Sequence, residues 1–403
     1  MRILYITPYV PSPIRIRPFN FIKGLAKLGH AVTLLALAPG DEAKQAPGVR
    51  PYCHELKIVP LTSRQILGNM LGNLLKPIPF QAAYGCSPQM QELIDRALKG
   101  GEFDVIHLEH LRASLFGRAI SGLPKVYDSV DCISLLFERA SESSPQIATR
   151  LMAKLDLSRT RRYEGRLGRL YDRILVTSEE DREALQALIA QRDTAHLHRK
   201  LVVLSNAVDL SYFAPLDAPR DSETLISTGK MSYHANVASV LYLGREVMPI
   251  IWRDRPQVKL WVVGKDPPSA IRALAADDRV TVTGYVPDLR PYLAQATVAV
   301  NPIPYSVGIQ NKVLESMAMG TPVVTSPRAC IALGVSPEKH LLVAHSTSTF
   351  AQQVSRLLDD SELRQRVGAA GRRYVEQNHS LARIATRLVS IYQGVIEGFG
   401  QGE

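Results

Sequence analysis

The sequence predicts an α/β protein made of two Rossmann-like domains, and three observations support this prediction. The chain has 403 residues, which is enough for two separate hydrophobic cores. Its opening, residues 2–38, has the pattern strand, loop, helix, strand, and residues 298–326 have it again. In both places the loop follows the carboxyl end of a strand, which is where open α/β sheets bind ligands.

The later of these two patterns is the more informative. A strand over 298–300 is stopped by Asn301-Pro302-Ile303-Pro304, because proline cannot donate to a sheet ladder. A loop containing Gly308 follows, and then a helix that ends at Gly320, a residue type that accepts the left-handed conformation of a helix cap. A second strand over 323–325 completes the unit.

This loop and helix are suited to binding a phosphate. Backbone N–H groups of residues 308–312 would point from the helix N-terminus toward an anion, and the Lys312 ammonium would add positive potential. Glu315, one turn further on, would accept hydrogen bonds from a ribose diol. The alternative interpretation is that Lys312 and Glu315, three residues apart, form an exposed helical ion pair.

The opening of the chain has the same layout but a different loop. A strand over 2–7 and a helix over 19–28 precede a strand over 31–38, and the first loop has no glycine but contains Arg15 and Arg17. Guanidinium groups make bidentate contacts with phosphates and carboxylates, so these arginines are candidates for binding an anionic acceptor or a donor phosphate. They are alternatively ordinary solvent-facing side chains.

Two further strand ends in the front half carry polar residues. Glu109 and His110 follow a strand over 103–108, and one of them is expected to face the ligand. Asp128 and Asp131 lie at the end of the next strand, where they would bind acceptor hydroxyls or act as a base. Either aspartate would also serve as the cap of the following helix.

Two amphipathic segments leave open whether they face the protein or a membrane. Residues 64–80 place leucines, isoleucine and methionine at helical spacing with asparagines opposite, which suits either a core face or a membrane-docking element. Residues 150–173 contain eight Lys/Arg against three Asp/Glu, interleaved with leucines. This basic helix is interpreted as a solvated face or as a surface for lipid phosphates.

Composition excludes several classes of function. The formal charge is +10, and residues 1–215 hold 28 of the 48 Lys/Arg and 21 of the 38 Asp/Glu, which gives that part +7. No nucleic-acid-binding motif accompanies this charge, and aromatic content is only 6%, so we expect no nucleic-acid partner. The four cysteines lack metal-ligand spacing, and no signal peptide or membrane span is expected. We therefore predict a cytoplasmic protein, with peripheral contact to the inner membrane face left open.

Three segments resemble one known family. GIQNKVLESMAMGTPVVTS, VLSNAVDLSYFAP and VTGYVPDLRPYL are similar to motifs of the retaining, nucleotide-sugar-dependent glycosyltransferases of family 4. That family has the GT-B fold, two facing Rossmann-like domains with a cleft between them. The resemblance implies an acceptor-side domain over 1–215, completed by a C-terminal helix over 380–403, and a nucleotide-sugar-binding domain over 216–379.

The resemblance also implies roles for individual residues. The donor diphosphate would contact Lys230 and Lys312, the turn at Val286 would border the base, and no metal or other cofactor would be needed. The sequence departs from the family pattern twice: Asn236 replaces a second lysine, and Val307 replaces a glutamate that contacts the donor sugar. The implied donor-binding residues are Gly229, Lys230, Val286, Gly308, Ile309, Gln310, Asn311, Lys312, Val313 and Glu315; the catalytic candidates are Lys230, Lys312, Glu109 and His110; the acceptor-binding candidates are Arg15, Arg17, Asp128 and Asp131.

The function implied is transfer of a hexose to an acceptor hydroxyl with retention, in cell-surface polysaccharide or glycolipid synthesis. The acceptor would be a sugar, a lipid-linked sugar or a small molecule. A nucleotide-sugar 2-epimerase of the same fold is the first alternative, and it would need Glu109, His110 and Asp131 above the sugar. The second alternative is a non-catalytic nucleotide-sugar-binding protein, because Val307 and Asn236 change the motif.

Overall fold

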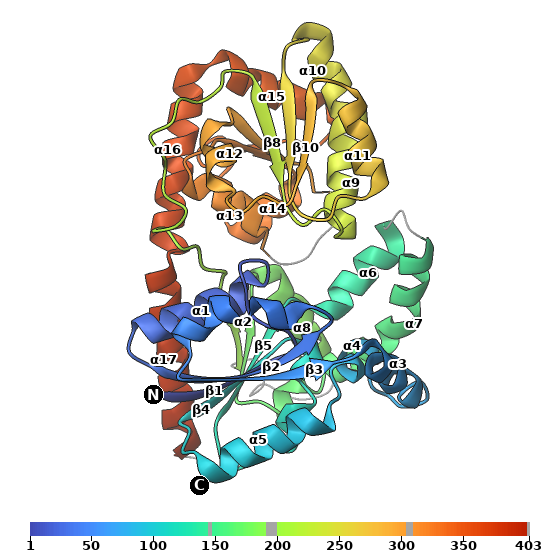
Figure 1. The fold of residues 1–403 in the computed structure, drawn as a ribbon, viewed down its shortest axis with the longest axis vertical. Helices are drawn as coiled ribbons and strands as arrows, with labels where there is room; N and C mark the ends of the chain where they lie inside the picture. Colours follow the sequence, from blue (N-terminus) through green and yellow to red (C-terminus); the bar gives the residue numbers. More distant parts are fainter. Residues whose placement is uncertain (144–146, 191–199, 304–308, 401–403) are drawn as a thin grey trace. The chain divides into compact units, whose positions relative to one another are not determined.

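The chain divides into two compact units. The computed structural model describes residues 1–143, 147–190, 200–303 and 309–400. The first unit comprises Met1–Ala207 and Leu381–Glu403, and the second comprises Val208–Ser380 (Figure 1). The division falls eight residues before the expected boundary after Pro215, because Val208 forms a parallel bridge with Ser380 and its N–H donates to the His379 carbonyl over 2.7 Å.

The first unit contains a seven-stranded sheet in which every pairing is parallel. β1 lies between β2 and β4, so the strand order reverses there, and this is the topological switch point of the sheet. The central strands are buried on both faces, which explains their continuous apolar sequences. In spatial order the strands are β3 (Glu55–Leu61), β2 (Ala31–Pro39), β1 (Arg2–Thr7), β4 (Val105–Glu109), β5 (Lys125–Val130), β6 (Arg173–Val176) and β7 (Leu201–Val203).

Helices cover this sheet, and two of them differ from the prediction. The expected helix over 64–80 is broken, because Pro77 and Pro79 interrupt it and separate α3 from α4. The basic helix over 150–173 ends at Glu164, where glycines follow and β6 then begins. The helices are α1 (Ile16–Lys27), α2 (Ala46–Val49), α3 (Ser63–Gly72), α4 (Phe80–Tyr84), α5 (Pro88–Gly100), α6 (Ile133–Ser143), α7 (Ile147–Glu164), α8 (Glu179–Ala190) and α17 (Leu381–Gly400).

The last helix belongs to the first unit. α17 buries Leu388 and Tyr392 in the core beneath β1 and β4, and the Tyr392 hydroxyl lies 2.7 Å from Nδ1 of His107. It crosses α1 at Gly24, where a Cβ atom would lie only 2.6 Å from the Cβ of Ala385. The residues after the second unit therefore complete the core that the first residues of the chain begin.

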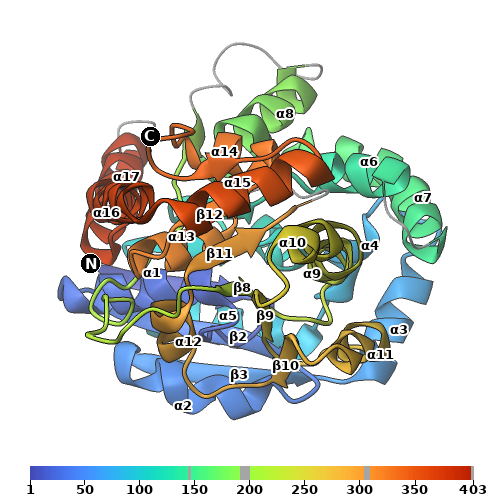
Figure 2. The same ribbon diagram turned by 90° about the horizontal axis from the view of Figure 1, so that it is seen from above.

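The second unit contains a six-stranded parallel sheet with helices around it (Figures 1 and 2). A hydrophobic cluster lies on each face of this sheet. Its switch point lies between β8 and β11. The strands in spatial order are β10 (Val280–Gly284), β9 (Lys259–Val263), β8 (Thr224–Thr228), β11 (Val298–Asn301), β12 (Val323–Thr325) and β13 (Leu342–Val343). The helices are α9 (His234–Tyr242), α10 (Met248–Asp254), α11 (Ser269–Arg272), α12 (Arg290–Gln295), α13 (Asn311–Ala318), α14 (Pro327–Leu333), α15 (Thr347–Asp359) and α16 (Ser361–Asn378).

Candidate functional site

The carboxyl edge of the second sheet is built from closely packed glycine backbone. Gly229, Gly264 and Gly284 lie at the ends of the adjacent strands β8, β9 and β10. The N–H of Gly229 donates to the Val263 carbonyl, and the N–H of Gly264 donates to the Gly284 carbonyl, each over 3.2 Å. A Cβ on Gly264 would lie 1.8 Å from the Gly229 oxygen. This close packing explains why glycine occupies the end of β9.

One asparagine brings the two predicted lysines to the same edge. Lys312, in the first turn of α13, donates from Nζ to Oδ1 of Asn236 over 3.0 Å. Nδ2 of Asn236, in α9, donates to the Lys230 carbonyl over 3.0 Å. The side chain that replaces the family's lysine thus bridges the end of β8 and the start of α13, while the side chain of Lys230 is exposed.

Lys312 is a buried ammonium whose hydrogen-bond partner is neutral. Its exposed fraction is 8%, and burial lowers its pKa to about 8. Burial also raises the pKa of Glu315 to about 7, and the described residues include no ion pair between these two side chains. The interpretation of Lys312 and Glu315 as an exposed helical ion pair is therefore wrong. A buried cation with no acidic partner among the described residues is costly, so the presence of Lys312 in the first turn of α13 favours an anionic ligand.

The start of α13 has the features expected for anion binding. Among the described residues, no side chain caps its N-terminus at Gln310, and the backbone dipole adds positive potential there. Ile309 and Val313 belong to a hydrophobic cluster against which Val286 also packs. Asn311 opens the helix. The predicted residue Gly308 and the departure at Val307 lie outside the described residues.

Asn301 is a further candidate that sequence reasoning missed. It ends β11 at the switch point, is 1% exposed, and has no partner for Oδ1 among the described residues. An unpaired buried polar atom at a strand end suits a ligand contact. The available signal was a polar residue as the last position of an otherwise apolar strand.

In the first unit, two predicted acceptor residues bind each other instead. Arg17 donates from Nε and Nη2 to the two carboxylate oxygens of Asp128 over 2.8 and 3.0 Å. Its Nη1 donates to the Leu204 carbonyl and to Oδ1 of Asn206. Because Arg17 is 4% exposed and Asp128 is 0% exposed, the prediction that they contact an acceptor is corrected. Their bidentate pair joins α1 to β5 inside the unit.

Glu109 is also a structural residue rather than a ligand contact. Its side chain is fully buried and accepts hydrogen bonds from the Tyr5 hydroxyl over 3.0 Å and the Tyr9 hydroxyl over 2.6 Å. Burial, together with the nearby Asp128 carboxylate, raises the pKa of Glu109 to about 8. Both carboxyl oxygens are thus engaged, and the catalytic prediction for Glu109 is corrected.

His110 follows Glu109 at the switch point of the first sheet, and its side chain is half-buried. Its φ is 66°, a strained backbone conformation for a residue other than glycine. Its Nδ1 accepts from the Arg112 N–H over 3.3 Å, and burial lowers its pKa to about 3, so the ring is neutral. Nearby, the Arg15 guanidinium lies 4.5 Å from the Tyr9 ring centroid and pairs with Glu42 over 3.1 Å.

Asp131 remains a candidate acceptor contact, but it does not cap the following helix. The N–H groups of Ile133 and Ser134 at the start of α6 donate to the Glu164 carboxylate over 2.8 and 3.0 Å, so an acid from α7 satisfies this helix end. Burial, followed by the charge of Asp181, raises the pKa of Asp131 to about 7. The capping interpretation of the aspartates is therefore wrong.

Two parallel doubly wound units, with a glycine-lined strand edge and a buried lysine in the second, define a protein of the GT-B class. Two family models match the chain: "Glycosyltransferase Family 4" over residues 18–212 and "Glycosyl transferases group 1" over residues 222–360. Together they span most of both units. The chain belongs to the family 4 glycosyltransferases with the GT-B fold.

Several known proteins are similar to this chain. The phosphatidyl-myo-inositol mannosyltransferase of Mycobacterium leprae (strain TN) is 25% identical over 334 residues, covering 79% of this chain and 82% of that protein. The lipopolysaccharide core biosynthesis glycosyltransferase LpsE of Rhizobium meliloti (strain 1021) is 29% identical over 172 residues, covering 39% of this chain and only 46% of that protein. The structure of Anabaena HepE in complex with UDP and glucose matches with a TM-score of 0.70 at 13% identity, covering 98% of this chain and 100% of that one.

Proposed function

We propose that this protein transfers a sugar from a nucleotide-diphosphate sugar to an acceptor hydroxyl, with retention of anomeric configuration. The observation that carries the proposal is the buried Lys312 ammonium at the switch point of the second sheet, held by a neutral amide and placed in the first turn of α13. A diphosphate would supply the missing counter-charge.

The second unit offers a contact for each part of such a donor. Lys230 and Lys312 neutralise the diphosphate, and the backbone amides at Ile309 and Gln310 are directed to the same anion or to the sugar. Glu315 accepts hydrogen bonds from the ribose hydroxyls, and Val286 lies beside the base. The binding of UDP by HepE, a protein of the same fold, supports a nucleotide donor.

The reaction can proceed without a protein base. In the proposed step the acceptor oxygen forms a bond to the anomeric carbon on the face that the diphosphate leaves, and the carbon–oxygen bond to the phosphate breaks. The acceptor proton passes to the departing phosphate oxygen. Catalysis then comes from positioning and from the positive groups that stabilise the leaving diphosphate; the proposal assigns this charge to the two lysines and no role to a metal ion.

The acceptor proposed is a sugar or lipid-linked sugar of cell-surface polysaccharide or glycolipid synthesis. The names of two relatives support this class, since one refers to lipopolysaccharide core biosynthesis and the other to phosphatidyl-myo-inositol. Arg15, His110 and Asp131, which follow strand ends of the first unit, are the proposed acceptor contacts.

A donor panel tests the proposal. The full chain is incubated with UDP-, GDP- and ADP-linked hexoses and with candidate sugar and glycolipid acceptors, and released nucleoside diphosphate is measured while NMR reports the anomeric configuration of the product. Lys312→Ala should lower the rate at least about 100-fold, because it removes a charge that acts on the leaving group. Lys259→Ala, an exposed lysine at the start of β9, is the matched control and should retain wild-type turnover.

Two other results of this assay would support an alternative function instead. Isomerisation of the donor sugar without transfer would indicate an epimerase, and tight binding of a nucleotide sugar without turnover would indicate a binding protein. No described feature favours the epimerase, because Glu109, one of the three side chains it would need, is held by two tyrosine hydroxyls.

A further inference from the structure

Exposed apolar side chains are concentrated in one region of the first unit. Of the fifteen large hydrophobic residues that are exposed in the described chain, eight lie on α3, on the turn after it, and on α7. Leu75 is 97% exposed and Ile147 is 80% exposed. We call this region the α3–α7 surface; it comprises Leu67, Leu71, Leu74, Leu75, Ile147, Leu151, Met152 and Leu155.

The apolar residues of α7 form a stripe on the side of the helix that faces away from the core. Ile147, Leu151 and Leu155 recur every four residues, while the buried residues of α7, such as Ala153 and Thr160, lie on the opposite side. An apolar stripe of this kind costs free energy in water and is unusual unless something covers it.

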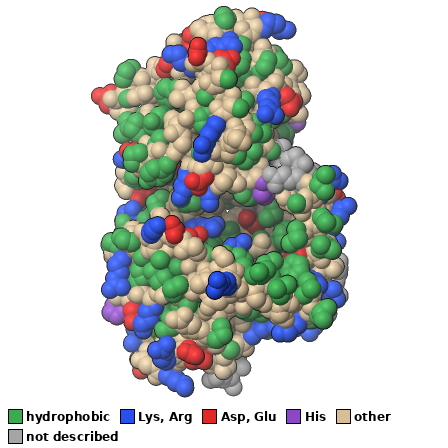
Figure 3. Space-filling model, turned by 45° about the vertical axis from the view of Figure 1, so that its right-hand side comes forward, with side chains coloured by type: hydrophobic (Ala, Val, Ile, Leu, Met, Phe, Trp, Pro, Cys, Tyr) green, Lys and Arg blue, Asp and Glu red, His purple; other side chains and the backbone are tan. Residues whose placement is uncertain are grey.

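Basic side chains lie along the same stripe. α7 carries five Lys/Arg, and two more follow just beyond its end: Arg150, Lys154, Arg159, Arg161 and Arg162 in the helix, then Arg166 and Arg169. Figure 3 shows hydrophobic and basic side chains interspersed along the right-hand side of the unit that holds both termini. Cations around an apolar stripe are typical of helices that lie in a membrane interface.

The two parts of the surface are tied together. Nη2 of Arg159 donates to the Leu74 carbonyl over 2.6 Å, and the same guanidinium lies 4.9 Å from the Phe80 ring centroid. The Phe80 N–H donates to Oδ2 of Asp156, on α7, over 2.9 Å. The turn bearing Leu74 and Leu75 is therefore fixed to α7, and the leucines of both helices belong to one surface.

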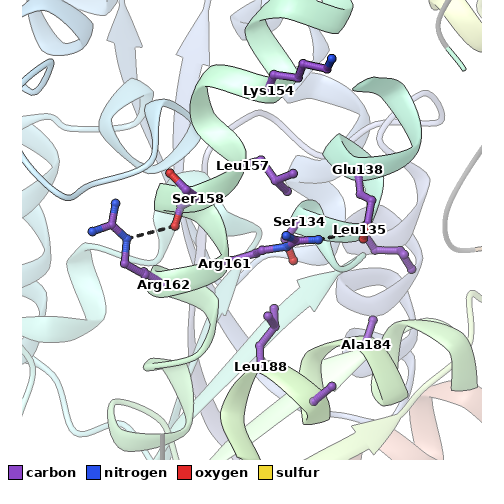
Figure 4. Close-up of a pocket in the computed structure, with 11 residues that line it drawn as sticks. Ser134, Leu135, Glu138, Lys154, Leu157, Ser158, Arg161, Arg162, Ala184 and Leu188 are labelled. Carbon is purple, nitrogen blue, oxygen red and sulfur yellow. Dashed lines mark hydrogen bonds and ion pairs between the residues drawn. The ribbon is translucent and has the colours of Figure 1, made fainter. Parts of the chain in front are cut away.

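A pocket opens beside this surface. It has a volume of about 730 Å³ and lies between α6, α7 and α8 (Figure 4). Lys154 and Arg162 line it together with Leu157 and Leu188, and Arg161 spans it to pair with Glu138 over 2.9 Å. The cations of α7 thus stand next to a recess with apolar walls, a combination suited to a phosphate group that carries a hydrocarbon chain.

We propose that the α3–α7 surface docks on an anionic lipid bilayer, with its leucines in the acyl region and its α7 cations on lipid phosphates. Charge complementarity selects this partner, since the apolar stripe is bordered by cations. No helix in the described part of the chain is long and apolar enough to cross a membrane, and interfacial docking needs none. The docking proposal concerns membrane binding and does not depend on which sugar the protein transfers.

Sedimentation with vesicles tests the docking on the full chain. Binding to vesicles of phosphatidylcholine with about one-third phosphatidylglycerol should be at least about tenfold stronger than to phosphatidylcholine alone, and should weaken in about 0.5 M salt. The double variant Leu71→Ser with Leu155→Ser should bind at least about tenfold less. Ile331→Ser, on α14 of the second unit and 71% exposed, is the matched control and should bind like wild type.

A second pair of variants separates charge from apolar contact. Lys154→Gln and Arg162→Gln should each weaken binding about fivefold on anionic vesicles and leave binding to neutral vesicles unchanged. Thermal denaturation and nucleotide binding of every variant should match wild type, because these side chains are exposed. A protein that binds vesicles but no nucleotide sugar would disprove the proposed function and leave the docking intact.

Three results would overturn the docking proposal. One is equal binding to neutral and anionic vesicles, and another is vesicle binding that the leucine variants do not change. The third is self-association in sedimentation equilibrium that the leucine variants abolish, because the surface would then be covered by a second copy of the chain.

Discussion

At the scale of single residues, the candidate donor site contains two ionisable side chains on α13, Lys312 and Glu315. Burial disfavours the charged form of each. Burial lowers the pKa of Lys312 to about 8 and raises that of Glu315 to about 7. The ammonium is needed for the diphosphate and the carboxylate is the better acceptor for ribose hydroxyls. Only a narrow range of pH therefore leaves both groups charged before the donor arrives.

Donor affinity should accordingly have a bell-shaped dependence on pH. Glu315 gains its charge as pH rises through about 7, and Lys312 loses its charge as pH rises through about 8. Calorimetric titration with a nucleotide-diphosphate sugar, whose phosphates do not titrate in this range, should give maximal affinity between these two values. In Glu315→Gln the decline on the acidic side should disappear and the decline on the basic side should stay. An affinity that does not change between about pH 6 and 9 would contradict this prediction.

Replacing the buried lysine should stabilise the protein while it removes binding. A lysine with a lowered pKa in the folded state makes an unfavourable contribution that is fully present below pH about 8 and vanishes above its ordinary pKa. Lys312→Met should therefore raise the free energy of unfolding by about 1–3 kcal/mol at pH 7, and the gain should shrink as pH rises toward about 10.5. Urea denaturation measures this, with Lys259→Met as the control at an exposed position.

A loss of stability in Lys312→Met at pH 7 would show that the ammonium has a favourable partner in the unliganded protein. Donor binding should fall in the same variant regardless of its stability, since the countercharge to the diphosphate is gone.

At the scale of elements, the second unit positions its ligands through strand ends rather than through long side chains. Gly264 at the end of β9 lets the backbone at the end of β8 approach closely. α9 and α13 are joined through Asn236 at the same edge. The site thus depends on the mutual placement of three strands and two helices.

A methyl group at the end of β9 should disturb this edge. A Cβ on Gly264 would meet the Gly229 oxygen at 1.8 Å, so Gly264→Ala should lower the free energy of unfolding by about 2–3 kcal/mol and weaken nucleotide binding at least about tenfold. Gly394→Ala is the matched control, because nothing lies within 4 Å of that position in α17. Thermal denaturation with and without nucleotide measures both effects, and an unchanged affinity in Gly264→Ala would disprove the role of this edge.

The sequence predicted these elements well where the information is local. Parallel strands buried on both faces appear as continuous apolar runs. The start of α13 lies within a few residues of Lys312 and Glu315, so one short segment contains the main residues of the candidate donor site. The helix over 64–80 was predicted as one element because its apolar spacing continues across Pro77 and Pro79. Proline geometry overrode that periodicity.

The candidate site in the first unit was much less predictable. Arg17 and Asp128 are 111 residues apart in sequence, and Glu164 caps a helix that begins 31 residues before it. No local pattern indicates such pairings, so a buried ion pair and a buried carboxyl were both interpreted as ligand contacts. Tyr9, which holds Glu109, lies two residues past the end of β1 and carried no signal of its own.

At the scale of the whole molecule, the two units differ in how the chain builds them. The second unit is one continuous segment, whereas the first is assembled from two segments that the second unit separates in sequence. α17 supplies Leu388 and Tyr392 to a core to which β1, β2, β4 and α1 also contribute. The stability of the first unit therefore depends on a helix that follows all of the second.

A change at the crossing of α1 and α17 should affect the first unit alone. Gly24→Ala places a Cβ 2.6 Å from that of Ala385 and should destabilise the first unit by about 1–3 kcal/mol. The double variant Gly24→Ala with Ala385→Gly should recover part of the loss in a double-mutant cycle, because the two methyl groups no longer collide. Thermal denaturation followed by hydrogen exchange should show weaker protection in residues 1–207 and unchanged protection in 208–380, and equal weakening in both would contradict the prediction.

The position of α17 in the chain also determines the order of biogenesis. On the ribosome, residues 208–380 emerge before α17, residues 381–400. The second unit therefore has all of its residues available for folding while the first unit still lacks α17. The first unit therefore stays incomplete, with the side of α1 that α17 covers exposed to chaperones and proteases, until residues 381–400 have left the exit tunnel. If synthesis ended before α17 was translated, the product would contain a complete second unit and an incomplete first unit.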